Sequence, residues 1–174
     1  MIIMERARRA IGRAINEHFV ETLVIAALVI ISAMIAIHLV TYTPERYTGF
    51  GVLNEQKEPG PFPVNMTFGE VLPVYTDVLN REGKTMQYMV RVVIGDSISA
   101  VDPVTGVVGG VFLECHEAIV MDGQTWEQAM SLRFNNTLIG NKKIFFELWM
   151  LDTATAAYRF TRQVLHVWIE ILEP

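Results

Sequence analysis

The chain lacks several features that define common classes of protein. It has one cysteine, Cys115, so it cannot form an internal disulfide, and a domain outside the cytoplasm must be held together by its core. Four arginines and three glutamates precede residue 23, a net charge of +1, so with a total of −5 the rest of the chain carries −6. That part has no basic surface of the kind that nucleic acid requires, and we expect no nucleic-acid partner.

The motifs of common catalytic and cofactor sites are also missing. No Ser-His-Asp set and no pair of carboxylates stands out, and strand alternation at a solvated edge explains Glu114 and Glu117. Gly106, Gly109 and Gly110 are not followed by a helix, so they do not form a phosphate-binding loop. We therefore expect a protein without enzymatic activity and without a cofactor.

One long apolar run is present, Leu23–Val40, and it contains no charge, proline or glycine. As a helix this run rises about 27 Å, close to the hydrocarbon thickness of a bilayer. It is too long for the apolar part of a cleaved signal peptide, and no small-x-small cleavage site follows it. The sequence predicts one transmembrane helix over residues 23–42, which places the protein in the cell membrane with the lipid bilayer as its first partner.

The segment before this run, residues 1–22, is rich in arginine and helical in pattern. It is typical of a basic amphipathic helix that lies along anionic headgroups, and equally of the first turns of one long helix that enters the membrane. Arg6, Arg8, Arg9 and Arg13 place the N-terminus in the cytoplasm and residues 43–174 outside, since basic residues stay on the cytoplasmic side.

Gly12 and Glu17 permit a second interpretation of this region. A glycine, a glutamate five residues later and a hydrophobic helix resemble the processing site of type IV pilins. Arg13 would then be the first mature residue, which fits that pattern poorly. A pilin-like filament subunit is therefore one alternative function.

After Thr43-Pro44, which ends the helical pattern, residues 43–174 alternate with the period of strands. Pro73 marks an edge or entry position, Gly95–Gly110 is loop-like, and Asp152–Tyr158 suits a helical turn. The predicted strands are Tyr47–Asn54, Val71–Leu79, Met86–Ile94, Val111–Met121, Trp126–Phe134, Ile144–Leu151 and Arg162–Leu172. About seven short strands predict an all-β, Ig-like antiparallel β-sandwich with one N-terminal transmembrane helix.

Several segments in this domain form a recognisable pattern: Phe62–Glu70 (FPVNMTFGE), Val78–Glu82 with Tyr88, Phe146–Leu151, Tyr158-Arg159 and Leu165–Ile169. In order and spacing they resemble an archaeal membrane-protein family known as domain of unknown function sixteen-sixteen. The resemblance implies an archaeal surface location and an Ig-like adhesion or assembly domain, and no known activity. Family members often have several N-terminal spans, whereas one is predicted here.

The same motif residues have a physical interpretation that is structural. Asn65 can bond its own backbone at a strand entry, and Gly69 permits a positive φ. Tyr158 and Arg159 can clamp a loop before the last strand. The full set of motif residues is Asn65, Gly69, Glu70, Asn80, Glu82, Tyr158 and Arg159.

A copper site of the cupredoxin type is a further alternative, since such a site needs two histidines, a cysteine and an axial methionine. Cys115, His116, Met121 and His166 supply those residue types. Cys115 and His116 are adjacent in a predicted strand, however, so their side chains point to opposite faces. We therefore predict no metal ligands, and a small buried role for Cys115.

Two kinds of surface feature remain. Asn65 and Asn135 begin N-glycosylation sequons on the predicted outer side, which makes the chain a candidate glycoprotein. The last two predicted strands are apolar on both faces, so either a loop covers the second face or a partner contacts it. For a partner, the contact candidates are Phe145, Trp149 and Trp168.

The sequence thus favours a non-enzymatic, single-pass membrane protein. It would be an accessory or structural subunit of a membrane or cell-surface assembly, acting through its outer β-sandwich on a membrane-protein partner or a second copy. A membrane-anchored electron-transfer domain and a pilin-like subunit are the alternatives.

Overall fold

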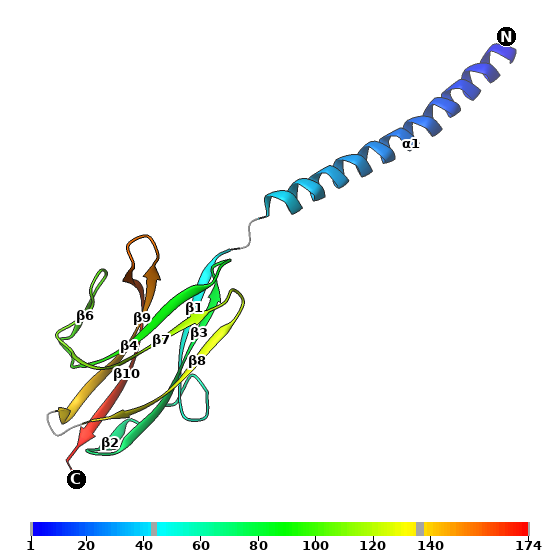
Figure 1. The fold of residues 1–174 in the computed structure, drawn as a ribbon. Helices are drawn as coiled ribbons and strands as arrows, with labels where there is room; N and C mark the ends of the chain where they lie inside the picture. The colour runs from blue at the N-terminus through cyan, green and yellow to red at the C-terminus, as the bar shows by residue number, and fades with distance from the viewer. Residues whose placement is uncertain (1, 43–44, 135–137, 174) are drawn as a thin grey trace. The chain divides into compact units, whose positions relative to one another are not determined.

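The computed structural model describes residues 2–42, 45–134 and 138–173, which form two compact units, Met1–Pro44 and Glu45–Pro174 (Figure 1). The predicted helix end at Thr43-Pro44 lies outside the described residues.

The first unit is one continuous helix, α1, from Ile2 to Thr41. Residues 1–22 and 23–42, predicted as separate segments, therefore belong to the same helix up to Thr41. Its part from Phe19 to Thr41 has a mean hydropathy of 2.9 and no buried residue. By length and composition, this apolar part is long enough to cross a bilayer.

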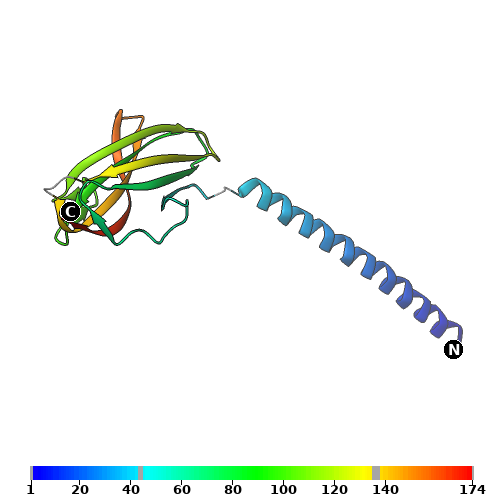
Figure 2. The ribbon, with the colours of Figure 1, turned by 90° about the horizontal axis from the view of Figure 1, so that it is seen from below.

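The second unit consists of two packed sheets and a small hairpin (Figures 1 and 2). The first sheet has the order β1-β3-β8 and the second the order β2-β10-β9-β4-β7. All pairs are antiparallel except the parallel pair of β2 with β10. The strands are β1 (Tyr47–Leu53), β2 (Asn65–Thr67), β3 (Val71–Arg81), β4 (Met86–Gly95), β5 (Ala100–Asp102), β6 (Gly106–Val108), β7 (Val111–Val120), β8 (Thr125–Arg133), β9 (Gly140–Asp152) and β10 (Ala157–Leu172).

Strict alternation of side chains forms the core between the two sheets. In β3 every second residue from Leu72 to Asn80 is buried, and in β4 the inward residues are Tyr88, Val90 and Val92. Burial of each apolar side chain among these residues contributes roughly 1.5–3 kcal/mol, which is how a domain without a disulfide is stabilised. The predicted all-β domain with one apolar N-terminal helix is confirmed.

Three details of the prediction are wrong. The described domain has ten strands rather than about seven, because short strands carry too few residues to show a period. The predicted loop Gly95–Gly110 contains the hairpin β5–β6. Asp152–Tyr158 forms no helical turn: β9 runs to Asp152, β10 begins at Ala157, and a tight turn with Ala156 at a φ of 52° joins them.

Pro73 lies in β3, the central strand of the first sheet, and not in an edge strand. It pairs with Ser131 of β8, whereas β1 extends along β3 only as far as Tyr75. Pro73 therefore has a paired strand on one side only. Proline has no N–H to donate to a neighbouring strand, so it is tolerated where one side is unpaired.

Candidate functional site

The outer face of the five-stranded sheet carries an unusual group of aromatic and cationic side chains. Inward residues such as Val92 and Leu148 lie in the core, so their neighbours along each strand point outward. Across the strands, Arg91 lies opposite Glu147, and Trp149 lies opposite Phe160. We call the outward set the aromatic face: Arg91, Phe112, Lys143, Trp149, Phe160 and Trp168.

Cation–π contacts connect the members of the aromatic face. The guanidinium of Arg91 lies 5.8 Å from the ring centre of Phe112 and 5.9 Å from that of Trp149. The ammonium of Lys143 lies 5.4 Å from the ring centre of Trp168. The rings of Trp149 and Phe160 are 5.4 Å apart and tilted. These contacts hold large side chains in place at the surface, each by about 0.5–1 kcal/mol.

Glu147, on the same side of the sheet, is fully buried although it carries a carboxylate. The hairpin β5–β6 covers it, and the backbone N–H of Val107 donates to its Oε1. The indole Nε1 of Trp149 donates to its Oε2 over 3.1 Å, and Arg91 Nε lies 3.7 Å from the same oxygen. A buried carboxylate needs such partners, so this network fastens the hairpin to the sheet and orients Trp149.

The three predicted partner-contact residues differ in their exposure. The assignment of Phe145 is wrong, because it is only 1% exposed and packs with Val93 and Val107 beneath the hairpin. Trp149 is half-buried, and Trp168 is 47% exposed. The hairpin thus covers Phe145 and leaves Trp168 open to solvent. Sequence reasoning missed Arg91, Lys143 and Glu147, whose positions depend on cross-strand register.

Asn80 shows most directly what the family motif does. Its amide nitrogen donates to the carbonyls of Lys84 and Val120, and its carbonyl oxygen accepts from the N–H of Glu82. The Tyr88 hydroxyl lies 3.3 Å from the same oxygen. Asn80 therefore joins the turn after β3 to the end of β7, which is a structural role.

Five more motif residues also have structural roles. Gly69 has a φ of +89°, as expected, and Glu70 accepts a bond from the N–H of Thr67. Glu82 accepts from the Thr48 hydroxyl over 2.7 Å. Tyr158 donates to Glu117 over 2.7 Å, and Arg159 pairs with Asp152 over 3.2 Å.

The residues considered for copper do not come together. Cys115 is exposed on the outer face, opposite Arg91, whereas the adjacent His116 points inward and lies 3.6 Å from Glu114. His166 lies on β10 opposite Phe145. Within the described ranges, no three His, Cys, Asp or Glu residues are grouped as a metal site would require. The predicted buried role of Cys115 is wrong, because it lies on an edge strand.

The two sequons differ in what the structure describes. Asn65 is the first residue of β2 and is exposed, with its backbone paired to Glu170 of β10. Asn135 lies outside the described residues.

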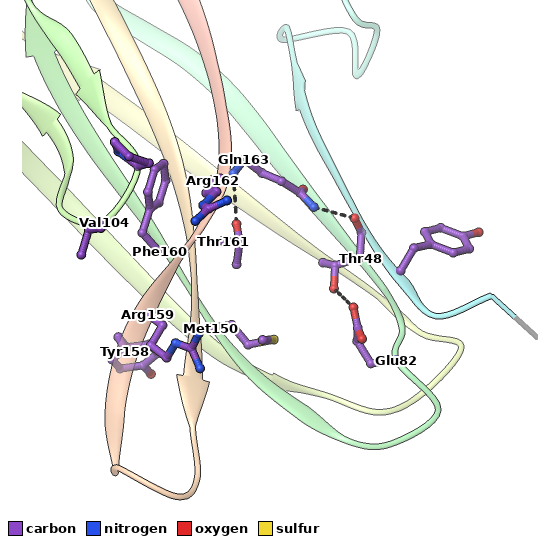
Figure 3. Close-up of a pocket in the computed structure, with 12 residues that line it drawn as sticks. Thr48, Glu82, Val104, Met150, Tyr158, Arg159, Phe160, Thr161, Arg162 and Gln163 are labelled. Atoms are coloured by element: carbon purple, nitrogen blue, oxygen red, sulfur yellow. Dashed lines mark hydrogen bonds between the residues drawn. The ribbon is translucent and has the colours of Figure 1, made fainter.

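A groove of about 700 Å³ lies beside β10, at the end of the domain where β1 begins (Figure 3). Its walls come from β1, the end of β3, the tip of the hairpin β5–β6 and the first half of β10. The side chains that reach it include Tyr47, Glu82, Val104, Arg159 and Arg162.

Fold and surface together define a class: a β-sandwich domain that follows an apolar helix long enough to cross a membrane. The family model described as "Domain of unknown function (DUF1616)" matches residues 41–170. The chain belongs to this family. No curated protein matches the sequence.

Solved structures give only remote likenesses. A β-glucosidase from Listeria innocua aligns with a TM-score of 0.47 and 13% identity over 75% of this chain, which spans 17% of the glucosidase. A CARDB domain from Pyrococcus furiosus, solved with di-metal ions, aligns with a TM-score of 0.47 and 10% identity over 74% of this chain and 90% of that one. Neither carries an argument about activity.

Proposed function

We propose that the protein is a non-enzymatic accessory or structural subunit of a membrane or cell-surface assembly. Its helix anchors it with the N-terminus in the cytoplasm, and its β-sandwich binds a partner protein outside the cell through the aromatic face. The observation that carries this proposal is the exposure of Trp168 and Phe112, at 47% and 51%, beside Lys143 and Arg91.

Exposed aromatic and cationic side chains of this kind are suited to a protein interface. Tryptophan and arginine are enriched at the centres of protein interfaces. Tryptophan supplies a large contact area at little cost in conformational entropy, because its side chain has only two rotatable bonds. Here the contacts of Lys143 with Trp168, and of Arg91 with Phe112, restrict both cations before any partner arrives. A surface held in its binding conformation loses less entropy on association.

Co-purification tests this proposal. The full chain, extracted in mild detergent, is expected to retain a stoichiometric partner, identified by mass spectrometry, or a second copy of itself. Trp168→Ala should weaken retention by at least about tenfold, the loss expected for a residue central to an interface. Val64→Ala is the control, because Val64 is also exposed and apolar but lies before β2, outside the aromatic face. A lone monomer, or equal retention by both variants, would count against the proposal.

A further inference from the structure

The groove beside β10 contains a cation that no residue in the described part of the chain neutralises. The Arg162 guanidinium takes part in no hydrogen bond or ion pair with any residue in the described ranges. The neighbouring Arg159 is paired with Asp152 but remains largely exposed. With Glu82, these are the charged residues lining the groove, so its net charge is +1. This contrasts with the charge of −6 carried by the chain after residue 22.

The backbone holds Arg162 in an unusual conformation. Arg162 has a φ of 67° at the irregularity of β10 between Phe160 and Val164. For a residue with a side chain this conformation costs about 1 kcal/mol. Three contacts hold it: Thr161 Oγ1 donates to the Leu148 carbonyl, the Gln163 N–H donates to Thr161 Oγ1, and Gln163 Nε2 donates to the Thr48 carbonyl.

The opposite wall has a different chemistry. Figure 3 shows Arg159 and Arg162 on β10, with Thr48 and Glu82 across the groove. The Thr48 hydroxyl donates to Glu82 Oε1, so this wall offers carboxylate oxygens that accept hydrogen bonds. A ligand that satisfies both walls carries an anionic group for the arginines and a hydroxyl group for Glu82. Arginine is suited to phosphate oxygens because its planar donors can bind two of them at once.

We propose that this groove binds the polar headgroup of a phospholipid, with the phosphate at Arg162 and Arg159 and a headgroup hydroxyl at Glu82. A membrane lipid is favoured because one wall of the groove lies close in sequence to the apolar helix. Tyr47, which lines it, follows Thr41, the last residue of the apolar helix, by six residues, and a fully extended linker of that length spans about 21 Å. The groove adjoins the aromatic face at Phe160, but its charged residues are not members of that face, so lipid binding here does not depend on the partner proposed there.

The test uses the full chain in detergent and three probes: dihexanoylphosphatidylglycerol, dihexanoylglycerol, which lacks the phosphate, and inorganic phosphate. Binding is followed by the fluorescence of tryptophan, since Trp149 contacts Phe160 at the groove wall. We expect saturable binding of the phospholipid, weakened at least about tenfold by Arg162→Asn. Asparagine tolerates a positive φ, so the variant keeps its backbone. Arg133→Gln, at the end of β8 and outside the groove, should bind as the wild type does.

The remaining outcomes overturn the proposal. Equal binding of dihexanoylglycerol would mean that the acyl chains, not the phosphate, are recognised. Inorganic phosphate that binds as tightly as the phospholipid would make the groove a site for free phosphate. Unchanged phospholipid binding by Arg162→Asn would exclude the groove, and Arg159→Gln provides the second variant should Arg162→Asn fold poorly.

Discussion

At the scale of single residues, Tyr158 shows how the β-sandwich holds the first residues of β10 in place. Its hydroxyl donates to Glu117 of β7 and accepts from Gln87 Nε2 of β4 over 2.9 Å. One side chain therefore links three strands of the sheet. Burial, reinforced by the Glu117 carboxylate, raises the pKa of Tyr158 to about 12.

This raised pKa predicts a loss of stability at high pH. The folded state holds the phenol proton more tightly than the unfolded state, whose pKa is near 10.0, so the contribution is fully present below pH 10 and is lost as pH rises towards 12. An ultraviolet absorbance titration, compared with Tyr158→Phe, isolates this phenol. Glu117→Gln should lower its pKa because the carboxylate is removed. An unchanged titration in that variant would contradict the assignment.

The structural roles of some residues could be predicted from the sequence, and those of others could not. Gly69 could be assigned a structural role, because a positive φ is a local effect that glycine permits. Asn80 could be identified only as a motif residue, because its bond to the Val120 carbonyl spans 40 residues of sequence. The burial of Glu147 could not be predicted. Its neighbours in sequence place it on an outward face, and only the hairpin, 40 residues earlier in the chain, covers it.

At the scale of elements, the hairpin β5–β6 decides which part of the outer face is open. It covers Phe145 and reaches the buried carboxylate of Glu147, and this approach depends on a glycine. A Cβ at Gly106 would collide with Glu147 Oε1 and lie 3.1 Å from the ring of Trp149. The absence of a side chain at Gly106 therefore allows the hairpin to lie against the sheet.

Gly106→Ala should accordingly detach the hairpin. Gly109→Ala is the matched control, since Gly109 also has a positive φ, +80° against +78°, but its Cβ would meet only ordinary contacts at 3.9 Å. Both substitutions carry the backbone cost of about 1 kcal/mol, and only Gly106→Ala adds the collision. Amide exchange at Val107 should therefore accelerate more in Gly106→Ala. Equal effects of the two substitutions would contradict this account of the hairpin.

The elements themselves were predictable where they are long. The alternation in Met86–Ile94 and Trp126–Phe134 identified β4 and β8, because one buried face imposes a period of two. β2, β5 and β6 have three residues each and no readable period. The sheet order was not predictable either, since non-local pairings such as β4 with β9 leave no local signal.

At the scale of the whole molecule, composition carried most of the prediction. The apolar helix is evident from hydropathy alone, because its run of apolar residues is long enough to cross a bilayer. The family assignment over residues 41–170 agrees with the motif resemblance in the sequence. The immunoglobulin-like class, the archaeal origin and the orientation in the membrane stay predictions. The aromatic face gathers side chains from four strands, β4, β7, β9 and β10, so no single segment of sequence reveals it.

Site-specific photo-crosslinking tests the central claim, that the aromatic face contacts a partner, most directly. A photoreactive phenylalanine analogue replaces Trp168 in one variant and Tyr75 in another, since Tyr75 lies on the outer face of the opposite sheet. In native membranes, we predict a discrete cross-linked product from position 168 and none from position 75. Absence of a product at position 168, or the same products from both positions, would contradict the claim.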